Sequence, residues 1–157
     1  MLGKLNNEEI EELIKSQVVG RIGCQENGFI YVVPISYAYK DPYIYGYTFE
    51  GMKMNIMRKN PGVCFEIDDT KDLANWKSVI AWGEFEELTT PEERNKALQN
   101  LNERVLPVIH SETMQISPLW PFSKEDPGKA NGIFFRIRLK EKTGRFEKSR
   151  DKYFYAT

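Results

Sequence analysis

The fold of this chain is decided by YTFEGMKMNIMRKNP, residues 47–61. This stretch has the pattern of a strand end, a glycine turn and a two-turn helix that Pro61 stops. The aromatic and β-branched residues of 43–48 favour a strand. Gly51 is expected to supply the free φ angle that a sharp turn into a helix needs, so the helix should begin at about Met52.

The charges of this helix point to a function. Arg58 and Lys59 fall in its last turn, where cations complement the helix dipole. Lys53 falls in the first turn, where a cation is unfavourable unless something negative lies beside it. Because a helix N-terminus already offers free N–H groups and a partial positive charge, a lysine there predicts a phosphate site. The alternative, that Glu50 neutralises Lys53 at the surface, remains equally open at this level.

Composition limits the possible functions. The 157 residues fit one domain, so residues 1–157 are expected to share one core. A net charge of -1 gives no basic surface for nucleic acid. We see neither an apolar run long enough to cross a bilayer nor a basic-then-apolar leader, so no membrane partner and a cytoplasmic location are expected.

Cysteine and histidine are too sparse for an ordinary metal site. Cys24 and Cys64 are isolated in apolar surroundings, and His110 is the one histidine of the sequence. We therefore expect no metal, and we interpret the cysteines as buried thiols rather than catalytic or disulfide-bonded residues. His110 has no acid or nucleophile near it in the sequence, so we identify no catalytic residue.

Periodicity and turn signals predict a mainly β protein. The expected elements are a capped helix over 6–15, strands over 18–24, 29–39, 43–48, 63–68 and 76–88, a helix from 90 to about 106, a loop over 107–131, and strands over 133–139 and 143–147. Six or seven strands in hairpin order with two main flanking helices favour a closed antiparallel barrel.

Several positions within these strands have more than one reading. Pro34 lies inside a strand, so either the strand is an edge or it bulges where a ligand replaces a partner strand. Gly20 and Gly23 predict a close approach or a bend, and Gly83 predicts a bend at a barrel corner. Arg21 is either a ligand contact or a surface residue.

Taken together, four segments resemble the flavin-binding split barrels of the pyridoxamine 5'-phosphate oxidase superfamily. They are VPISY (33–37), YTFEGMK (47–53), RKNPGV (58–63) and WKSV (76–79) followed by Gly83. The later TGR (143–145) is similar to the nitroimidazole-resistance (Nim-type) branch, and the resemblance covers roughly residues 10–147. It implies a six- to seven-stranded antiparallel split β-barrel that forms a homodimer, with FMN bound between the subunits.

The resemblance also implies a set of site residues. Lys53 would hold the FMN phosphate, the second strand would present its backbone to the isoalloxazine ring, and residues 76–79 would complete the site, in part from the other subunit. The implied cofactor-binding residues are Val33, Pro34, Ile35, Ser36, Thr48, Gly51, Lys53, Trp76, Ser78 and Val79.

The chain departs from true pyridoxamine phosphate oxidases. Their second-strand segment begins with arginine and ends with lysine, where this chain has YVVPIS (31–36), and they carry an arginine where it has Met52. The tail also lacks their tryptophan-then-arginine signature. Oxidation of vitamin B6 is therefore not expected.

The leading hypothesis is an FMN-dependent oxidoreductase that reduces a small organic acceptor, such as a nitroaromatic, with NADH or NADPH. Arg21, Trp120 and the loop around His110 are where substrate choice is expected to reside. The alternative is a flavin carrier or sensor without turnover. Haem binding is disfavoured for want of ligands, and a last alternative is a barrel that binds nothing. The choice between FMN and a deazaflavin stays open.

Overall fold

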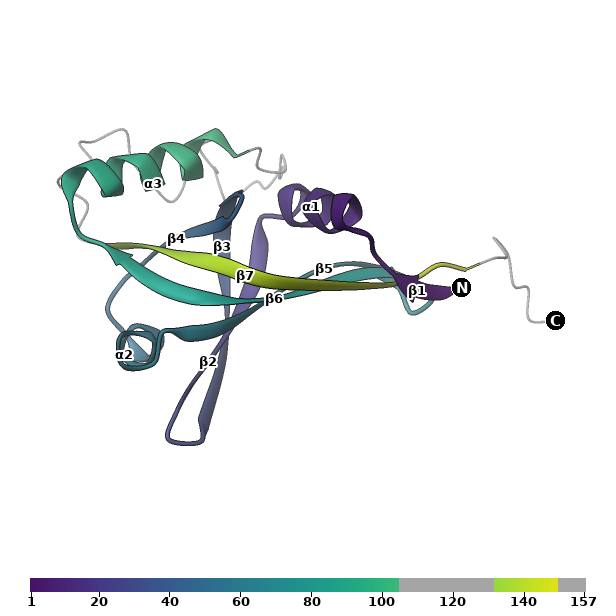
Figure 1. Ribbon diagram of the computed structural model, residues 1–157, viewed down its shortest axis with the longest axis horizontal. Helices are drawn as coiled ribbons and strands as arrows, with labels where there is room; N and C mark the ends of the chain where they lie inside the picture. The colour runs from purple at the N-terminus through teal and green to yellow at the C-terminus, as the bar shows by residue number, and fades with distance from the viewer. Residues whose placement is uncertain (105–131, 150–157) are drawn as a thin grey trace, which may run out of the picture.

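A computed structural model describes residues 1–104 and 132–149 (Figure 1). The strands are β1 (Leu2–Lys4), β2 (Val19–Glu26), β3 (Phe29–Lys40), β4 (Tyr43–Thr48), β5 (Gly62–Asp72), β6 (Asn75–Leu88) and β7 (Ile133–Glu147). The helices are α1 (Asn7–Ser16), α2 (Met52–Lys59) and α3 (Pro91–Glu103).

The strands form one antiparallel sheet that closes on itself. Its order is β1-β7-β4-β3-β2-β5-β6, and β6 pairs in turn with β7. All strands except β1 therefore form a ring, and β1 adds to the far end of β7 through Leu2–Lys4. The predicted antiparallel barrel is confirmed.

The ring is split between β3 and β4. These strands pair only where Tyr37–Lys40 meets Tyr43–Gly46. Along residues 29–36, β3 pairs with β2 on one edge, and in the described part of the chain no strand pairs with its other edge. Pro34 lies in this half of β3. Of the two readings of this proline, the edge is confirmed, because a residue without an N–H is tolerated at an edge.

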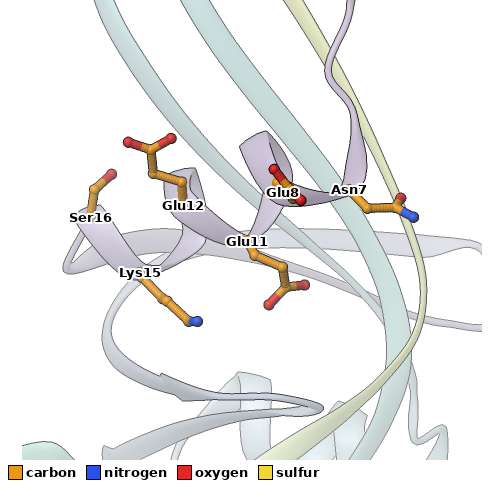
Figure 2. A pocket seen from close by; sticks show the side chains of 6 residues that line it. All are labelled: Asn7, Glu8, Glu11, Glu12, Lys15 and Ser16. Carbon is orange, nitrogen blue, oxygen red and sulfur yellow. The ribbon is translucent and has the colours of Figure 1, made fainter.

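The helices cover the open sides of the barrel. Apolar side chains of α1 and α2 join the barrel interior, where Ile14, Met54, Met57 and Phe65 are fully buried. A second cluster under α3 joins Ala97 and Leu101 to apolar residues of β3, β4, β6 and β7. The outward face of α1 carries the polar side chains of Asn7, Glu8, Glu11, Glu12, Lys15 and Ser16 (Figure 2). In the described ranges, no helix is both long and apolar enough to cross a membrane.

Local signals placed several elements correctly. The Asn6 side chain accepts a hydrogen bond from the Glu9 N–H and the Glu9 carboxylate accepts one from the Asn6 N–H, so the capping box is confirmed. Asn27 and Gly28 both have positive φ, as a tight hairpin turn requires. Thr90 caps α3 through the Glu93 N–H.

Other expectations are corrected. The two strands expected over 133–139 and 143–147 are one strand, because β6 pairs along its whole length and supports the polar residues between them. Strand β1 was not predicted. Gly51 has φ 175°, which is extended backbone that any residue adopts, so its expected free φ is not used. Helix α3 ends at Glu103, before the expected 106. The loop 107–131, with His110 and Trp120, lies outside the described residues.

Two glycines on β2 differ in what surrounds them. A Cβ at Gly20 would lie 2.4 Å from the Phe65 ring, whereas a Cβ at Gly23 would meet Cys64 at an ordinary 3.7 Å. The predicted close approach is thus confirmed at Gly20, whereas the described residues give no cause for it at Gly23. Gly83 lies at an irregularity in the pairing of β6 with β7, as its predicted bend requires.

This difference gives a matched test. Gly20→Ala should lower the free energy of unfolding by roughly 1–3 kcal/mol, because the added methyl overpacks the core against Phe65. Gly23→Ala should change it by no more than about 0.5 kcal/mol. Urea unfolding at one fixed protein concentration measures both. Equal effects of the two substitutions would contradict the packing explanation.

Candidate functional site

The predicted phosphate site lies where the barrel is split. Strand β4 leaves β3 after Gly46 and runs through Thr48 into α2. Helix α2 packs against β2, and in Figure 1 it lies at one end of the barrel, well away from β1. The unpaired edge of β3 and the N-terminus of α2 thus both follow from the point where β4 leaves β3.

Lys53 is half-buried in the first turn of α2. Burial lowers its pKa, since removal of water disfavours the charged form. Within residues 1–104 and 132–149 it forms no ion pair. A desolvated ammonium without a counter-ion is unfavourable, and an anion at this position would remove that cost.

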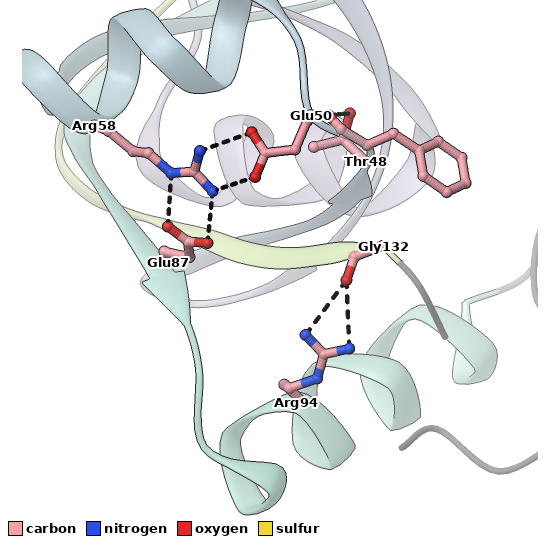
Figure 3. Close-up of polar contacts among 7 residues, drawn as sticks. Thr48, Glu50, Arg58, Glu87, Arg94 and Gly132 are labelled. Carbon is pink, nitrogen blue, oxygen red and sulfur yellow. Dashed lines mark hydrogen bonds and ion pairs between the residues drawn. The ribbon is translucent and has the colours of Figure 1, made fainter. Parts of the chain in front are cut away.

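Glu50 does not neutralise Lys53, because it pairs with Arg58. The Arg58 guanidinium donates from Nη1 and Nη2 to the Glu50 carboxylate at 2.7 and 2.8 Å. It also donates from Nε and Nη2 to Glu87 at 2.9 Å each. Figure 3 shows Arg58 between the two carboxylates. This geometry is bidentate on both sides and joins the turn before α2 to the end of β6.

The Arg58 hydrogen bonds also lower the pKa of both carboxylates. They hold the pKa of Glu50 and that of Glu87 below the ordinary value of 4.5. Both carboxylates are therefore charged at neutral pH and are hydrogen-bonded to Arg58. The alternative in which Lys53 pairs with Glu50 is wrong in this structure, and Lys53 stays available for an anion.

Cys24 is a neighbour of Lys53 that the sequence did not connect with it. Burial raises the pKa of the Cys24 thiol, and the charge of Lys53 opposes this shift more weakly. The thiol faces the Tyr31 carbonyl oxygen at 3.7 Å. Cys24 is buried, as expected, whereas Cys64 is only partly so. The proximity of Cys24 to Lys53 arises from packing of α2 on β2, which no local pattern predicts.

The predicted residues of β3 lie along its unpaired half. Val33 and Ile35 are partly buried and pack against the core, while Pro34 is exposed on the outer side. Thr48 is partly exposed at the end of β4, and Gly51 is exposed before α2. The single chain thus brings these residues and Lys53 to the same split.

Ser36 lies at the end of the unpaired half of β3 and has a hydrogen-bond partner, Arg104, that the sequence analysis did not identify. Arg104 donates from Nη1 to the Ser36 hydroxyl at 2.5 Å and to the Tyr37 carbonyl at 3.1 Å. Arg104 follows α3 directly, about seventy positions from Ser36 in the chain. It was missed because nothing in the sequence around it indicates this contact.

Trp76, Ser78 and Val79 lie elsewhere in the chain. Trp76 pairs in register with Glu147, which itself pairs with Leu2 of β1. In Figure 1, β1 and α2 lie at opposite ends of the barrel. One chain therefore does not bring this group together with Lys53.

The side chains of this second group have different surroundings. The Trp76 indole N–H donates to Glu147 at 3.1 Å, and the Ser78 hydroxyl donates to Glu66 at 3.3 Å. Val79 is 0% exposed and lies in the core, so within the single chain its side chain offers no surface to a ligand. The roles of Trp76, Ser78 and Val79 stay predictions.

An apolar row crosses the outer face of the barrel. Val32, Gly23, Cys64 and Trp82 are successive register partners on β3, β2, β5 and β6. Val32 is 62% exposed and Trp82 41%, and together with Ile30 they line a groove of about 750 Å³. Exposed apolar area that is continuous across four strands is typical of a protein interface.

Arg21 lies beside this row on the outer face. It forms ion pairs with Glu66 at 3.2 Å and Asp68 at 2.8 Å. These bonds raise its pKa further. Of its two readings, the structure supports a surface residue held by carboxylates. Among the residues described, no group of three or more His, Cys, Asp or Glu side chains could hold a metal ion.

Known proteins share this fold along most of the chain. A family model described as pyridoxamine 5'-phosphate oxidase matches residues 6–146. An uncharacterized protein from Rhizobium meliloti (strain 1021) is 28% identical over 149 residues, which cover 90% of this chain and 92% of the relative.

Solved structures of other proteins have a similar fold. A FAD-binding protein from Mesorhizobium loti is 29% identical with a TM-score of 0.71, covering 93% of this chain and 98% of its own. A candidate 5-nitroimidazole antibiotic resistance protein from Bacteroides thetaiotaomicron is 20% identical with a TM-score of 0.70, covering 93% and 87%. The second likeness concerns the fold alone.

Proposed function

The chain belongs to the pyridoxamine 5'-phosphate oxidase family, and on this premise we propose that it is an FMN-binding oxidoreductase that passes electrons from NADH or NADPH to a small organic acceptor. The observation that carries the proposal is Lys53, half-buried at the N-terminus of α2 without a carboxylate partner among the described residues. A flavin, when bound, supplies the hydride and electron chemistry.

The residues around the split fit such a cofactor. Lys53 and the free N–H groups of the first turn of α2 would neutralise the phosphate. The unpaired half of β3, which includes Val33–Ser36, offers backbone donors and acceptors to the edge of a flat ring. Arg58 holds the turn before α2 in place through Glu50 and Glu87, so the lysine is presented on a fixed backbone.

FMN is proposed from the family resemblance, whereas the Mesorhizobium loti protein is described as FAD-binding. Both flavins carry a phosphate next to the ribityl chain, so the role of Lys53 does not decide between them. Mass spectrometry of the cofactor released from the purified protein distinguishes the two.

Two observations support a homodimer. The predicted site residues fall into two groups at opposite ends of one chain. Val32 and Trp82 of the apolar row are exposed and line a groove with Cys64. In a dimer through this face, Trp76 and Ser78 of one subunit would complete the site that contains Lys53 of the other.

A flavin carrier or sensor is the second candidate. The described residues predicted to bind the cofactor include no Asp, Glu or His that could serve as acid or base, as a carrier or sensor would allow. Hydride transfer at a flavin does not require such a group, so the same observation is compatible with the oxidoreductase.

Substitution of Lys53 tests the phosphate site. Lys53→Ala should bind flavin roughly 10- to 150-fold more weakly, because a charge-assisted hydrogen bond contributes about 1.5–3 kcal/mol. Lys59→Ala is the matched control. Lys59 is an exposed lysine on the same helix, it pairs with Glu26 of β2, and its removal should leave flavin binding normal. Fluorescence titration with FMN measures both, and circular dichroism confirms folding.

The same titration has an expected pH dependence. Only protonated Lys53 attracts phosphate, and burial lowers its pKa. Flavin affinity should therefore fall as pH rises through this lowered pKa, and the fall should be absent in Lys53→Ala. Unchanged affinity of a folded Lys53→Ala protein would exclude the assigned role.

Charge on the apolar row tests the dimer. Val32→Asp should give a monomer that has lost flavin, while Asn95→Asp, which adds the same charge on the exposed side of α3, should remain a dimer. Light scattering after size-exclusion chromatography gives the mass. A wild-type monomer with bound flavin would contradict the shared site.

Mixed dimers sharpen this test. If each site takes Lys53 from one subunit and Trp76 from the other, a dimer of Lys53→Ala with Trp76→Ala contains one intact site. Co-expressed, differently tagged subunits should then bind about half the normal amount of flavin. No recovery relative to the two homodimeric variants would mean that each site takes both residues from one subunit.

The spectrum of the purified protein separates the two candidate functions. For the oxidoreductase, flavin absorption bands should bleach on anaerobic addition of NADH or NADPH and return when a nitroaromatic acceptor is added. Bands that neither nicotinamide bleaches would favour the carrier or sensor. A colourless protein that takes up no added FMN or FAD would reject both.

A further inference from the structure

A second pocket lies on another part of the molecule, between the C-terminal ends of α1 and α3 over β3. We call it the α1–β3–α3 pocket. Its volume is about 300 Å³, which suffices for a small ligand. It is lined by Ile14, Lys15, Gln17, Val18, Tyr37, Ala38, Tyr39, Lys40, Asn100, Glu103 and Arg104.

The charge of this pocket is predominantly positive. Lys15, Lys40 and Arg104 are its cations and Glu103 its one lining carboxylate. Glu103 accepts a hydrogen bond from Gln99, and in the described residues none of the three cations forms an ion pair. Figure 2 shows Lys15 projecting from α1 free of the neighbouring glutamates.

Arg104 is the half-buried cation of the set. Burial lowers its pKa, because no anion compensates its desolvation. Only Nη1 of its guanidinium has partners in the described structure, Ser36 and the Tyr37 carbonyl. Nε is buried without an acceptor, and so is Nδ2 of Asn100 on the same wall. Unmet buried donors are rare in proteins, and these two add to the cost of burying polar groups on this wall.

We propose that the α1–β3–α3 pocket binds a small oxyanion, the carboxylate or phosphate group of a metabolite, with Arg104 as its principal contact and Lys15 and Lys40 at its rim. An oxyanion would supply the missing charge, while Nη1 of Arg104 stays anchored to Ser36 and the Tyr37 carbonyl. Guanidinium is suited to this task because its planar donors match carboxylate and phosphate oxygens.

This site is separate from Lys53. It lies where β3 is paired with β4, beyond the unpaired half proposed for the flavin. The two share one contact, since Arg104 holds Ser36 at the end of that half. The proposal does not depend on flavin binding, and its test uses no flavin signal.

The test is a titration of the purified full-length protein with sodium phosphate and, separately, sodium succinate, at constant ionic strength. Amide NMR signals of Gln17, Val18 and Tyr37–Lys40 report the pocket. We expect saturable shifts that weaken roughly tenfold or more in Arg104→Gln and only in part in Arg104→Lys, which keeps the charge. Lys96→Gln removes a charge from the exposed side of α3 and should change nothing.

Lys53→Ala separates this site from the flavin site. It should retain the saturable shifts even when it has lost flavin. Stronger binding of phosphate would indicate a phosphorylated ligand, and stronger binding of succinate a carboxylate. Shifts that do not saturate, that are confined to α2, or that persist undiminished in folded Arg104→Gln would overturn the proposal. Should Arg104→Gln not fold, undiminished binding by Arg104→Lys and by Lys15→Gln together would also overturn it.

Discussion

The structure depends on β7, which forms hydrogen bonds along both of its edges. Over residues 134–138 it pairs with β4 on one side and with β6 on the other, and this double pairing closes the ring. The backbone groups of β4 need hydrogen-bond partners. Along residues 47–48, β4 pairs with β7 and no longer with β3. It therefore separates from β3 after Gly46. The split that holds the proposed cofactor site is a consequence of how the barrel closes.

Helix α2 follows β4 and packs against β2. Its apolar residues Met54, Ile56 and Met57 are buried in the core, which fixes the helix. Arg58 then binds Glu50 and Glu87 at once. Since both carboxylates are occupied, the described part of the chain leaves the charge of Lys53 uncompensated at the helix terminus. The arrangement is unfavourable for the isolated chain and favourable for a bound phosphate.

Arg104, beside the paired half of β3, resembles Lys53 in its surroundings. Like Lys53 it is a partly buried cation for which the described residues provide no carboxylate. Lys53 lies beside the unpaired half of β3, and Arg104 lies where β4 restores the pairing. The same strand thus presents two positions where an anion would compensate a desolvated charge, one for the cofactor phosphate and one for a separate oxyanion.

The sequence by itself determined the local elements. The capping box at Asn6, the turn at Asn27–Gly28 and the limits of β4 and α2 follow from hydrogen bonds and backbone preferences within a few residues. The lysine in the first turn of α2 was visible for the same reason. Only the tertiary structure decided that Arg58 binds Glu50 and Glu87 together. Glu87 lies about thirty residues after Arg58 in the chain, so no local pattern could indicate this contact. It likewise merged the last two strands into β7 and brought Cys24 to Lys53 and Arg104 to Ser36. These contacts depend on which strands pair around the ring, and that choice is made by the whole set of hydrogen bonds and packed side chains at once.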